Sequence, residues 1–580
     1  MNPADSEREP PIDPDASGVD HDVRDDSFAD PPRRLGAILL SVGPGLIVAG
    51  SIVGSGELIA TTKSGAEAGF TLLWLIVLGC VIKVFLQIEF GRHAIVTGQT
   101  PLRSLATVPG PRVRGRGNWL VWYWLVMWLA SISQLGGIVG TVGQAMAIAT
   151  PVTQSGRQYN ERADARAVDA IQALHRKHIA ATGRSDIESR NDQAANENAR
   201  PVGNAGPVRN TMHPDDAGSP MTSPDTPPID PAIWAAVVAV LTSGMLVWGR
   251  FGMIQTLSTV MVASFTLLTI ANLVMLQNEP MYAVSGSEFL SGFRFRLPDA
   301  GDVMGGAAPI KTALATFGII GVGAAELVVY PYWCLEKGYA KSVGRRPSDA
   351  RDSSDLSDPS DLSNRGVSDE FVGSNDPHRR WLQRARGWMR VMQFDAYGSM
   401  VVYTFATIAF YLLGAATLNR LSLNPEDSDL VRTLAMMYVP VFSDWARVVF
   451  LIGAVAVLYS TFFVANASHA RTFSDALRVI GVIASDEETR SRWIRILSGV
   501  FPLLCVAIYV YFPRPAQLVL ISGIAQGVML PMLAGAAIYF RRTRRVPGLS
   551  PGWWWDVALW TSGLAMLATG TWTAYRAIAG

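Results

Sequence analysis

Long apolar stretches alternate with short polar loops along most of the chain. Eleven of them are long enough to cross a membrane as a helix, because about 20 apolar residues span the hydrocarbon core of a bilayer. They lie at residues 36–61, 70–96, 119–149, 232–249, 253–277, 306–336, 393–418, 445–469, 493–512, 516–540 and 553–578. This pattern predicts an all-α polytopic membrane protein with about eleven transmembrane helices.

Three strongly polar segments divide the chain. Residues 1–34, 151–231 and 344–390 are rich in polar residues and poor in aromatic ones, so none of them can bury a core. We expect a disordered acidic N-terminal tail, a polar disordered insertion and a polar cytoplasmic insertion, respectively. Transmembrane helices one to three, four to six and seven to eleven then fall within residues 35–150, 232–343 and 391–580.

The composition agrees with this class and excludes several others. Hydrophobic residues make up 49% of the chain, and the net charge of +1 gives no basic surface for nucleic acid. The three cysteines, Cys80, Cys334 and Cys505, lie in apolar segments without ligand spacing, which excludes a disulfide framework and a zinc cluster. The sequence contains no nucleophile motif, phosphate-binding loop or zinc-protease motif, so we expect neither an enzyme nor a cofactor.

Basic residues in the short loops set the expected orientation, since cytoplasmic loops carry an excess of Lys and Arg. Arg33 and Arg34 precede the first span, and arginines cluster after the second and tenth spans, whereas the loop after the seventh carries Glu426 and Asp429. We therefore expect a multi-pass protein of the cell membrane with its N-terminus in the cytoplasm. After an odd number of spans, the C-terminus is expected outside.

Two spans carry the same six-residue pattern, V-G-x-x-E-L. It occurs at Val53–Leu58 in the first span and at Val322–Leu327 in the sixth. Glycines weaken the first helix at this point, and Pro331 removes a backbone donor from the sixth, so we expect unwinding near Gly54–Glu57 and Leu327–Tyr330. The two segments are offset by five spans, as expected for an inverted repeat of spans one to five and six to ten with the eleventh appended. Helices interrupted at matching positions of two halves indicate the substrate site of a transporter.

The two patterns place Glu57 and Glu326 at equivalent positions of the two halves. A carboxylate at bilayer depth is a functional candidate by default, and backbone carbonyls freed by unwinding must face protein, water or a cation. Two carboxylates and several carbonyls suit a divalent cation that prefers oxygen ligands. Alternatively, either glutamate could be a protonated structural residue bonded to a neighbouring helix.

Around these two glutamates, the chain resembles the Nramp family of divalent-metal transporters. The resemblance covers most of the spans but not the insertions. Its supports are GPGLIVAG at residues 43–50, VTGQ at 96–99, IVGTVGQAMAI in the third span, Tyr330-Pro331-Tyr332, and Leu530-Pro531. It implies the fold of the sodium-coupled amino-acid symporters and inward movement of metal from a site between the first and sixth helices.

The chain departs from the family motifs at the implied metal site. The family's D-P-G-N stands here as Gly54-Ser55-Gly56-Glu57, so its metal-binding aspartate maps to Gly54. Its M-P-H stands as Tyr330-Pro331-Tyr332, which lacks the thioether that favours soft transition metals. A carbonyl ligand maps to Leu327, and the glutamine of the tenth helix maps to Gly523, with Gln526 one turn later. The expected metal site comprises Glu57, Glu326, Gly54, Leu327, Tyr330 and Gln526.

The implied proton pathway is altered as well. The family's titratable groups map to Met127, Gln134, Gly137 and Tyr332, none of which replaces the lost carboxylates or histidine. The Nramp-related magnesium transporters show a similar pattern of departure. We therefore expect transport of a divalent cation, with Mg²⁺ or Mn²⁺ favoured, by alternating access and without tight proton coupling. The ion is the substrate, the lipid bilayer is the other expected partner, nucleic acid is not, and a monomer is expected.

Two other functions remain open. The first is transport of a small organic solute such as an amino acid, although paired glutamates would repel a substrate carboxylate. The second is a sensor that kept the fold without transport, as in the plant ethylene-signalling branch of the family. That branch carries a large cytoplasmic domain, whereas this sequence ends at Gly580, directly after its last span.

Overall fold

The computed structural model describes residues 29–113, 116–164, 228–248, 251–298, 308–344, 346, 377–426 and 429–579. Most of the N-terminal tail and the larger parts of both expected insertions fall outside these ranges. Within them, nearly all secondary structure is helical, and the described strands form one antiparallel pair, β1 (Arg112–Val113) and β2 (Arg116–Asn118). The predicted all-α class is confirmed.

The helices follow the predicted order of spans. Those before the sixth span are α1 (Leu35–Ser41), α2 (Pro44–Ile52), the π-helix η1 (Ser55–Thr61), α3 (Thr62–Ala68), α4 (Leu73–Thr97), α5 (Pro101–Leu105), α6 (Trp119–Ser131), α7 (Ser133–Ala149), α9 (Asp230–Trp248), α10 (Phe251–Met275) and α11 (Gly286–Ser291). Those that follow are α12 (Pro309–Ile319), α13 (Ala324–Glu336), α14 (Tyr339–Val343), α16 (Pro377–Leu413), the π-helix η5 (Gly414–Asn419), α17 (Leu430–Ala435), α18 (Val439–Phe442), α19 (Ala446–Val479), α20 (Glu487–Tyr511), α21 (Pro515–Thr543) and α22 (Trp553–Ala579). Single 3₁₀ turns lie at η3 (Leu276–Asn278), η7 (Met436–Tyr438) and η8 (Ser443–Trp445).

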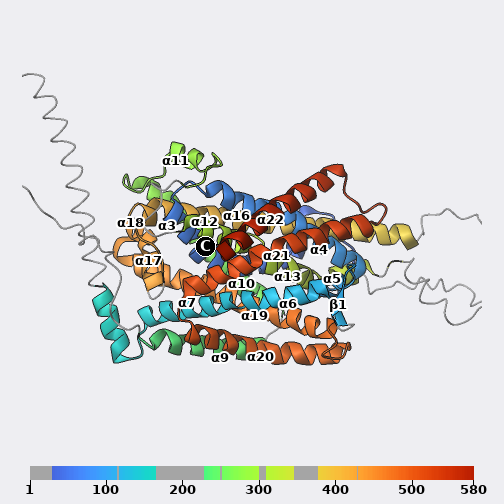
Figure 1. Cartoon of the computed structure of the whole chain (residues 1–580), viewed down its shortest axis with the longest axis horizontal. Helices are drawn as coiled ribbons and strands as arrows, with labels where there is room; N and C mark the ends of the chain where they lie inside the picture. Colours follow the sequence, from blue (N-terminus) through green and yellow to red (C-terminus); the bar gives the residue numbers. More distant parts are fainter. Residues whose placement is uncertain are drawn as a thin grey trace, which may run out of the picture.

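Within the described part of the chain, ten helical segments are long and apolar enough to cross a membrane. They correspond to the first ten predicted spans, and most of them run along the long axis of the molecule (Figure 1). The predicted eleventh span is α22, which is a helix of 27 residues but is not among the ten. Its charged residues Asp556 and Arg576, with several Thr and Gly, lower its hydropathy. The chain is a multi-pass membrane protein.

Two boundaries differ from the prediction. The first span begins at Pro44 rather than at residue 36, because α1 is a separate helix that ends at Ser41. A proline disfavours helical geometry in the residue before it, so the chain restarts as a new helix at Pro44. The helix of the seventh span begins at Pro377, inside the expected insertion 344–390, and buries Trp381 completely.

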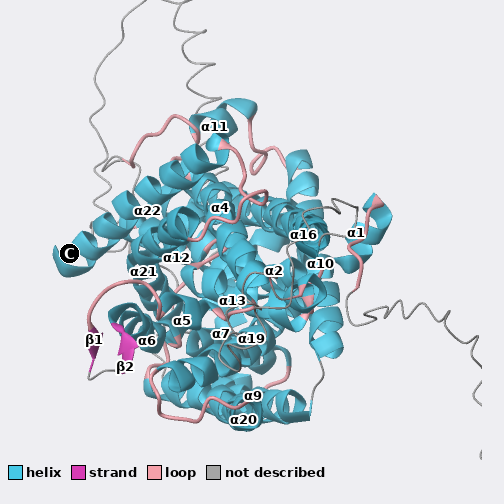
Figure 2. Cartoon of the chain, turned by 90° about the vertical axis from the view of Figure 1, so that its right-hand side faces the viewer, coloured by secondary structure: helices cyan, strands magenta, loops and turns pink. Residues whose placement is uncertain are grey.

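The two interrupted helices lie at the centre of the bundle. Viewed end-on, α2 and α13 lie in the middle, while α9 and α20 pack together at one edge (Figure 2). Five long helices pack against α2 or α13 and surround the interruptions: α4, α10, α16, α19 and α21. The site between the breaks is therefore surrounded by protein. Unpaired backbone groups at membrane depth must be shielded from lipid in this way.

Candidate functional site

The first helix is interrupted at Val53 and Gly54. Helix α2 ends at Ile52, and η1 begins at Ser55 with Gly54 as its N-terminal flanking residue. We predicted unwinding over Gly54–Glu57, but Ser55 to Glu57 are already helical. The carbonyl of Gly54 accepts the amide of Leu58 at 2.8 Å, so this predicted metal ligand already has a backbone partner.

The sixth helix is interrupted seven residues earlier than predicted. We expected unwinding from Leu327 to Tyr330, but this segment is helical, and the break lies between the end of α12 at Ile319 and the start of α13 at Ala324. The cause is Gly321, which adopts the left-handed conformation at φ 56° that other residues avoid. Pro331 lies inside α13 instead of breaking it.

The breaks place the two glutamates in the same local position. Glu57 is the third residue of η1 after Gly54, and Glu326 is the third residue of α13 after Gly323. The positive end of a helix dipole stabilises a carboxylate in the first turn. The shared sequence pattern therefore marks a shared structure, which supports the inverted repeat.

The two breaks lie next to each other. Ser51, in the last turn of α2, places its Oγ 3.5 Å from Oε1 of Glu326. The ammonium of Lys83, on α4, interacts electrostatically with both Glu57 and Glu326. The predicted proximity of the two broken helices is confirmed.

One oxygen of Glu57 is buried without a partner. The side chain is fully buried, and its Oε1 accepts the hydroxyl of Thr407 at 3.1 Å. Its Oε2 has no hydrogen-bond partner among the described residues. A buried carboxylate oxygen without a donor is costly, and it is available to a cation.

The carbonyl of Leu327 is also freed. In a regular helix this oxygen would accept the amide of residue 331, but that residue is Pro331 and has no N–H. Leu327 is fully buried in the first turns of α13, one residue after Glu326. The structure thus keeps this carbonyl available although α13 is continuous through the predicted break.

A chain of neutral amides and hydroxyls joins the two breaks through α7 and α21. Gln134 on α7 donates to Ser55 at 2.9 Å, and its Oε1 accepts Nε2 of Gln526 at 2.8 Å. Oε1 of Gln526 accepts the amide of Ala325 at 3.0 Å, and Ser522 donates to Gln134 at 3.0 Å. Gln526 therefore lies beside the start of α13, where it accepts an amide of the first turn.

Gly54 and Tyr330 each lie against a residue of another helix. A Cβ on Gly54 would collide with the hydroxyl of Thr461 on α19, so position 54 has no room for the family's aspartate. The hydroxyl of Tyr330 lies 3.1 Å from Oδ2 of Asp395, a residue that also accepts the amides of Gly43 and Gly45 at the start of α2. Asp395 and Tyr330 thus join the first, sixth and seventh helices.

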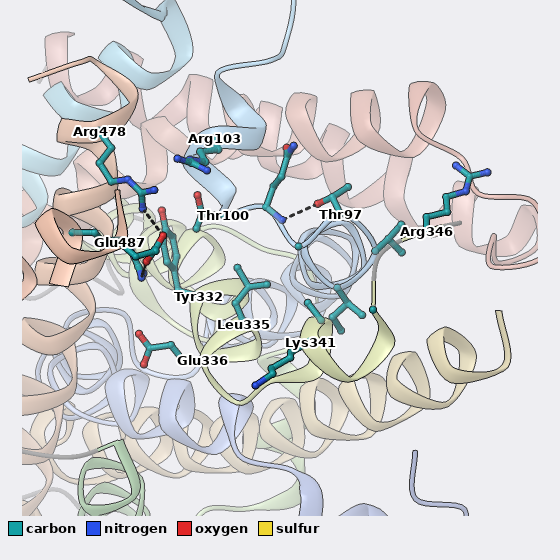
Figure 3. Close-up of a pocket in the computed structure, with 17 residues that line it drawn as sticks. Thr97, Thr100, Arg103, Tyr332, Leu335, Glu336, Lys341, Arg346, Arg478 and Glu487 are labelled. Atoms are coloured by element: carbon teal, nitrogen blue, oxygen red, sulfur yellow. Dashed lines mark hydrogen bonds and ion pairs between the residues drawn. The ribbon is translucent and has the colours of Figure 1, made fainter. Parts of the chain in front are cut away.

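A cavity of about 940 Å³ opens near the C-terminal end of α13. Tyr332 lines it, six residues after Glu326 and thus about 9 Å further along the helix axis. Figure 3 shows Tyr332 beside Arg478 and Glu487, with Lys341 and Glu336 farther along the wall. The hydroxyl of Tyr332 donates to Asp475 at 2.7 Å, which joins this wall of the cavity to α19.

Sequence reasoning missed Lys83 and Thr407 as site residues. Lys83 lies in the middle of the 25-residue helix α4, and a charge at that depth is a signal that could have identified it. Thr407 gave no signal, because single threonines are common in membrane helices. Among the described residues, no group of three or more His, Cys, Asp or Glu side chains could hold a metal, so a site here relies on two carboxylates and neutral oxygens.

Residues 373–576 match the family model described as Nramp, natural resistance-associated macrophage protein-like. The chain is 34% identical over 108 residues to the divalent metal cation transporter MntH 1 of Pseudomonas aeruginosa, covering 18% of this chain and 23% of that protein. It is 29% identical over 131 residues to the metal transporter Nramp4 of Arabidopsis thaliana, covering 22% and 24%. These alignments span about a quarter of each relative.

Two solved structures of mutant forms of a manganese transporter from Eremococcus coleocola have the same fold. Their TM-scores are 0.54 and 0.51 at 13% identity, with coverage of 94% and 95% of this chain and 88% and 98% of theirs. The residues in the family match include Gln526 but neither Glu57 nor Glu326. Residues 373–576 are therefore similar to the Nramp family, and the curated relatives are similar to this chain over about a quarter of their own length.

Proposed function

We propose that the chain transports a divalent metal cation through a site between the two broken helices. The observation that carries this proposal is the pairing of Glu57 and Glu326, each in the first turn after a break, at two breaks that lie side by side. The free oxygen of Glu57 and the carbonyl of Leu327 add unsatisfied acceptors. An ion that binds both carboxylates and this carbonyl would satisfy them together.

The donor set favours Mg²⁺ or Mn²⁺ as the substrate. Carboxylate, carbonyl and amide oxygens are the ligands that these ions prefer, whereas soft thioether ligands select other metals. The family's methionine is replaced by Tyr330, whose hydroxyl is engaged with Asp395. The ion is the cargo, and the proposal requires no resident cofactor and no second subunit.

Alternating access would expose the site first to one side of the membrane and then to the other. The cavity lined by Tyr332 supports an open path on the side where α4 and α13 end. With the N-terminus in the cytoplasm, as the loop charges predict, this side is cytoplasmic and the C-terminus is outside. Asp395 holds the start of α2 against Tyr330 and would have to release it when the path closes.

Transport is proposed to proceed without tight proton coupling. Gln134 occupies one of the positions of the family's relay carboxylates, and it takes part in a neutral network with Ser55 and Gln526. An amide does not titrate and cannot carry a net proton across. Liposomes that contain a pH dye test this directly: metal entry should leave the internal pH unchanged, and acidification in proportion to metal entry would refute it.

Uptake by the purified chain in liposomes tests the transport proposal. We expect saturable entry of Mg²⁺ and Mn²⁺, reported by internal metal-sensitive dyes, and no entry with a Glu57→Gln, Glu326→Gln double variant as the matched control. Uptake of amino acids with no metal entry would favour the organic-solute alternative. Absence of uptake of both, in vesicles that hold folded protein, would overturn transport and favour a sensor.

A further inference from the structure

A buried lysine binds the free backbone carbonyl groups at the C-terminal end of α12. Lys83 is fully buried, and its ammonium donates to the carbonyl of Ile320 at 2.9 Å and to that of Phe317. The same nitrogen lies 4.8 Å from the centre of the Phe317 ring, in a cation–π arrangement. It forms no direct ion pair with a carboxylate among the described residues, so its contacts are two backbone oxygens and an aromatic face.

This environment is suited to a cation. The last carbonyls of a helix have no partner within it and carry the negative end of the helix dipole. At the end of α12 the carbonyl of Thr316 accepts the amide of Ile320, which leaves those of Phe317 and Ile320 for Lys83. The corresponding end of α2 is satisfied differently, because the hydroxyl of Thr461 donates to Gly50 at 3.1 Å.

The lysine also changes the charge of the site. Glu57 and Glu326 both interact electrostatically with it, so its charge compensates one of the two carboxylates. A monovalent ion bound to the same carbonyls would have the same effect. The lysine, however, is attached to α4 and cannot leave with the substrate.

We propose that the carbonyls of Phe317 and Ile320 form a monovalent-cation subsite that the ammonium of Lys83 permanently occupies, so that divalent-ion binding needs no inorganic co-ion. This inference rests on the proposed function. It predicts that removing the lysine side chain vacates the subsite. The chain then depends on a small monovalent cation from solution.

The test measures Mn²⁺ binding to purified wild-type and Lys83→Ala protein in sodium, methylammonium and N-methylglucamine chloride. Wild-type affinity should be the same in all three media. The variant should bind about tenfold or more weakly in N-methylglucamine, which is too large for the vacated space, because buried carbonyls lose a charged donor. Sodium or methylammonium should restore its binding.

Lys63→Ala is the matched control. Lys63 is also buried in a membrane helix, but it pairs with Glu67 at 3.0 Å and Glu426 at 2.7 Å, so its loss should create no dependence on monovalent cations. Lys83→Gln keeps one donor for the carbonyls and covers the case in which the alanine variant does not fold. A smaller dependence on sodium or methylammonium is expected for it.

The outcomes separate the two proposals. Sodium dependence of the wild type, or binding by both Lys83 variants that is the same in every medium, would overturn the subsite while leaving metal binding intact. Absence of Mn²⁺ binding by the folded wild type in all three media would instead count against the proposed function.

Discussion

Replacing Glu57 by Gln separates the charge of this residue from its hydrogen bond. The amide keeps an oxygen that can accept the hydroxyl of Thr407, which lies 3.1 Å from the carboxylate. It removes one of the two negative charges next to the proposed ion. The substitution removes a charge from the membrane interior, so it should not reduce the amount of protein inserted into the membrane.

The size of the effect follows from electrostatics. At an effective dielectric near 20 and a separation of about 3 Å, one carboxylate attracts a divalent ion by on the order of 10 kcal/mol. Removing water from both partners offsets most of this attraction and leaves a net loss of about 3 kcal/mol, roughly a hundredfold in affinity. Glu326→Gln should weaken binding to a similar extent.

Isothermal titration of Mg²⁺ and Mn²⁺ into purified protein, with uptake into liposomes, measures this loss. Thr407→Val is the matched control, because it removes the hydrogen bond but leaves the charge of Glu57. It should reduce affinity by about tenfold at most, the usual value of one hydrogen bond. Normal binding and transport by both glutamine variants would show that the carboxylates are structural and that the site lies elsewhere.

Three further substitutions test details of the site. Gly54→Asp should abolish uptake, because its side chain collides with Thr461, and adding Thr461→Gly should recover part of the activity. Gly321→Ala should lower the stability measured by thermal unfolding by about 2 kcal/mol, because alanine is strained at this φ and its Cβ would lie 2.9 Å from the Cα of Cys80, whereas Gly535→Ala, in open space, should not. Cys80→Ser should leave Mg²⁺ and Mn²⁺ uptake unchanged if only oxygen ligands bind the ion; loss of uptake would indicate a sulfur ligand.

Much of the fold could be predicted because membrane-spanning helices are recognised from the length and apolar composition of their segments. The repeated V-G-x-x-E-L pattern also located both breaks to within a few residues, and it marks the same position relative to each break. The predicted break at Leu327–Tyr330 was wrong because Gly321, and not Pro331, ends the helix. Pro331 fits inside α13 at the loss of one hydrogen bond, whereas Gly321 supplies the left-handed turn that ends α12.

The contacts of the site could not be predicted, because they depend on packing between distant segments. Thr407 lies 350 residues from Glu57, and Gln134 lies 392 residues from Gln526. The steric reason for glycine at position 54 is a threonine on α19. A single sequence gives residue types and local spacing but not these pairings.

Anomalous diffraction from crystals soaked in Mn²⁺ tests the central claim most directly. We expect one strong peak between the two breaks, within about 2.5 Å of a carboxylate oxygen of both Glu57 and Glu326. The peak should be lost in the double glutamine variant. A Mn²⁺ peak elsewhere in the bundle with none between these two carboxylates would contradict the account.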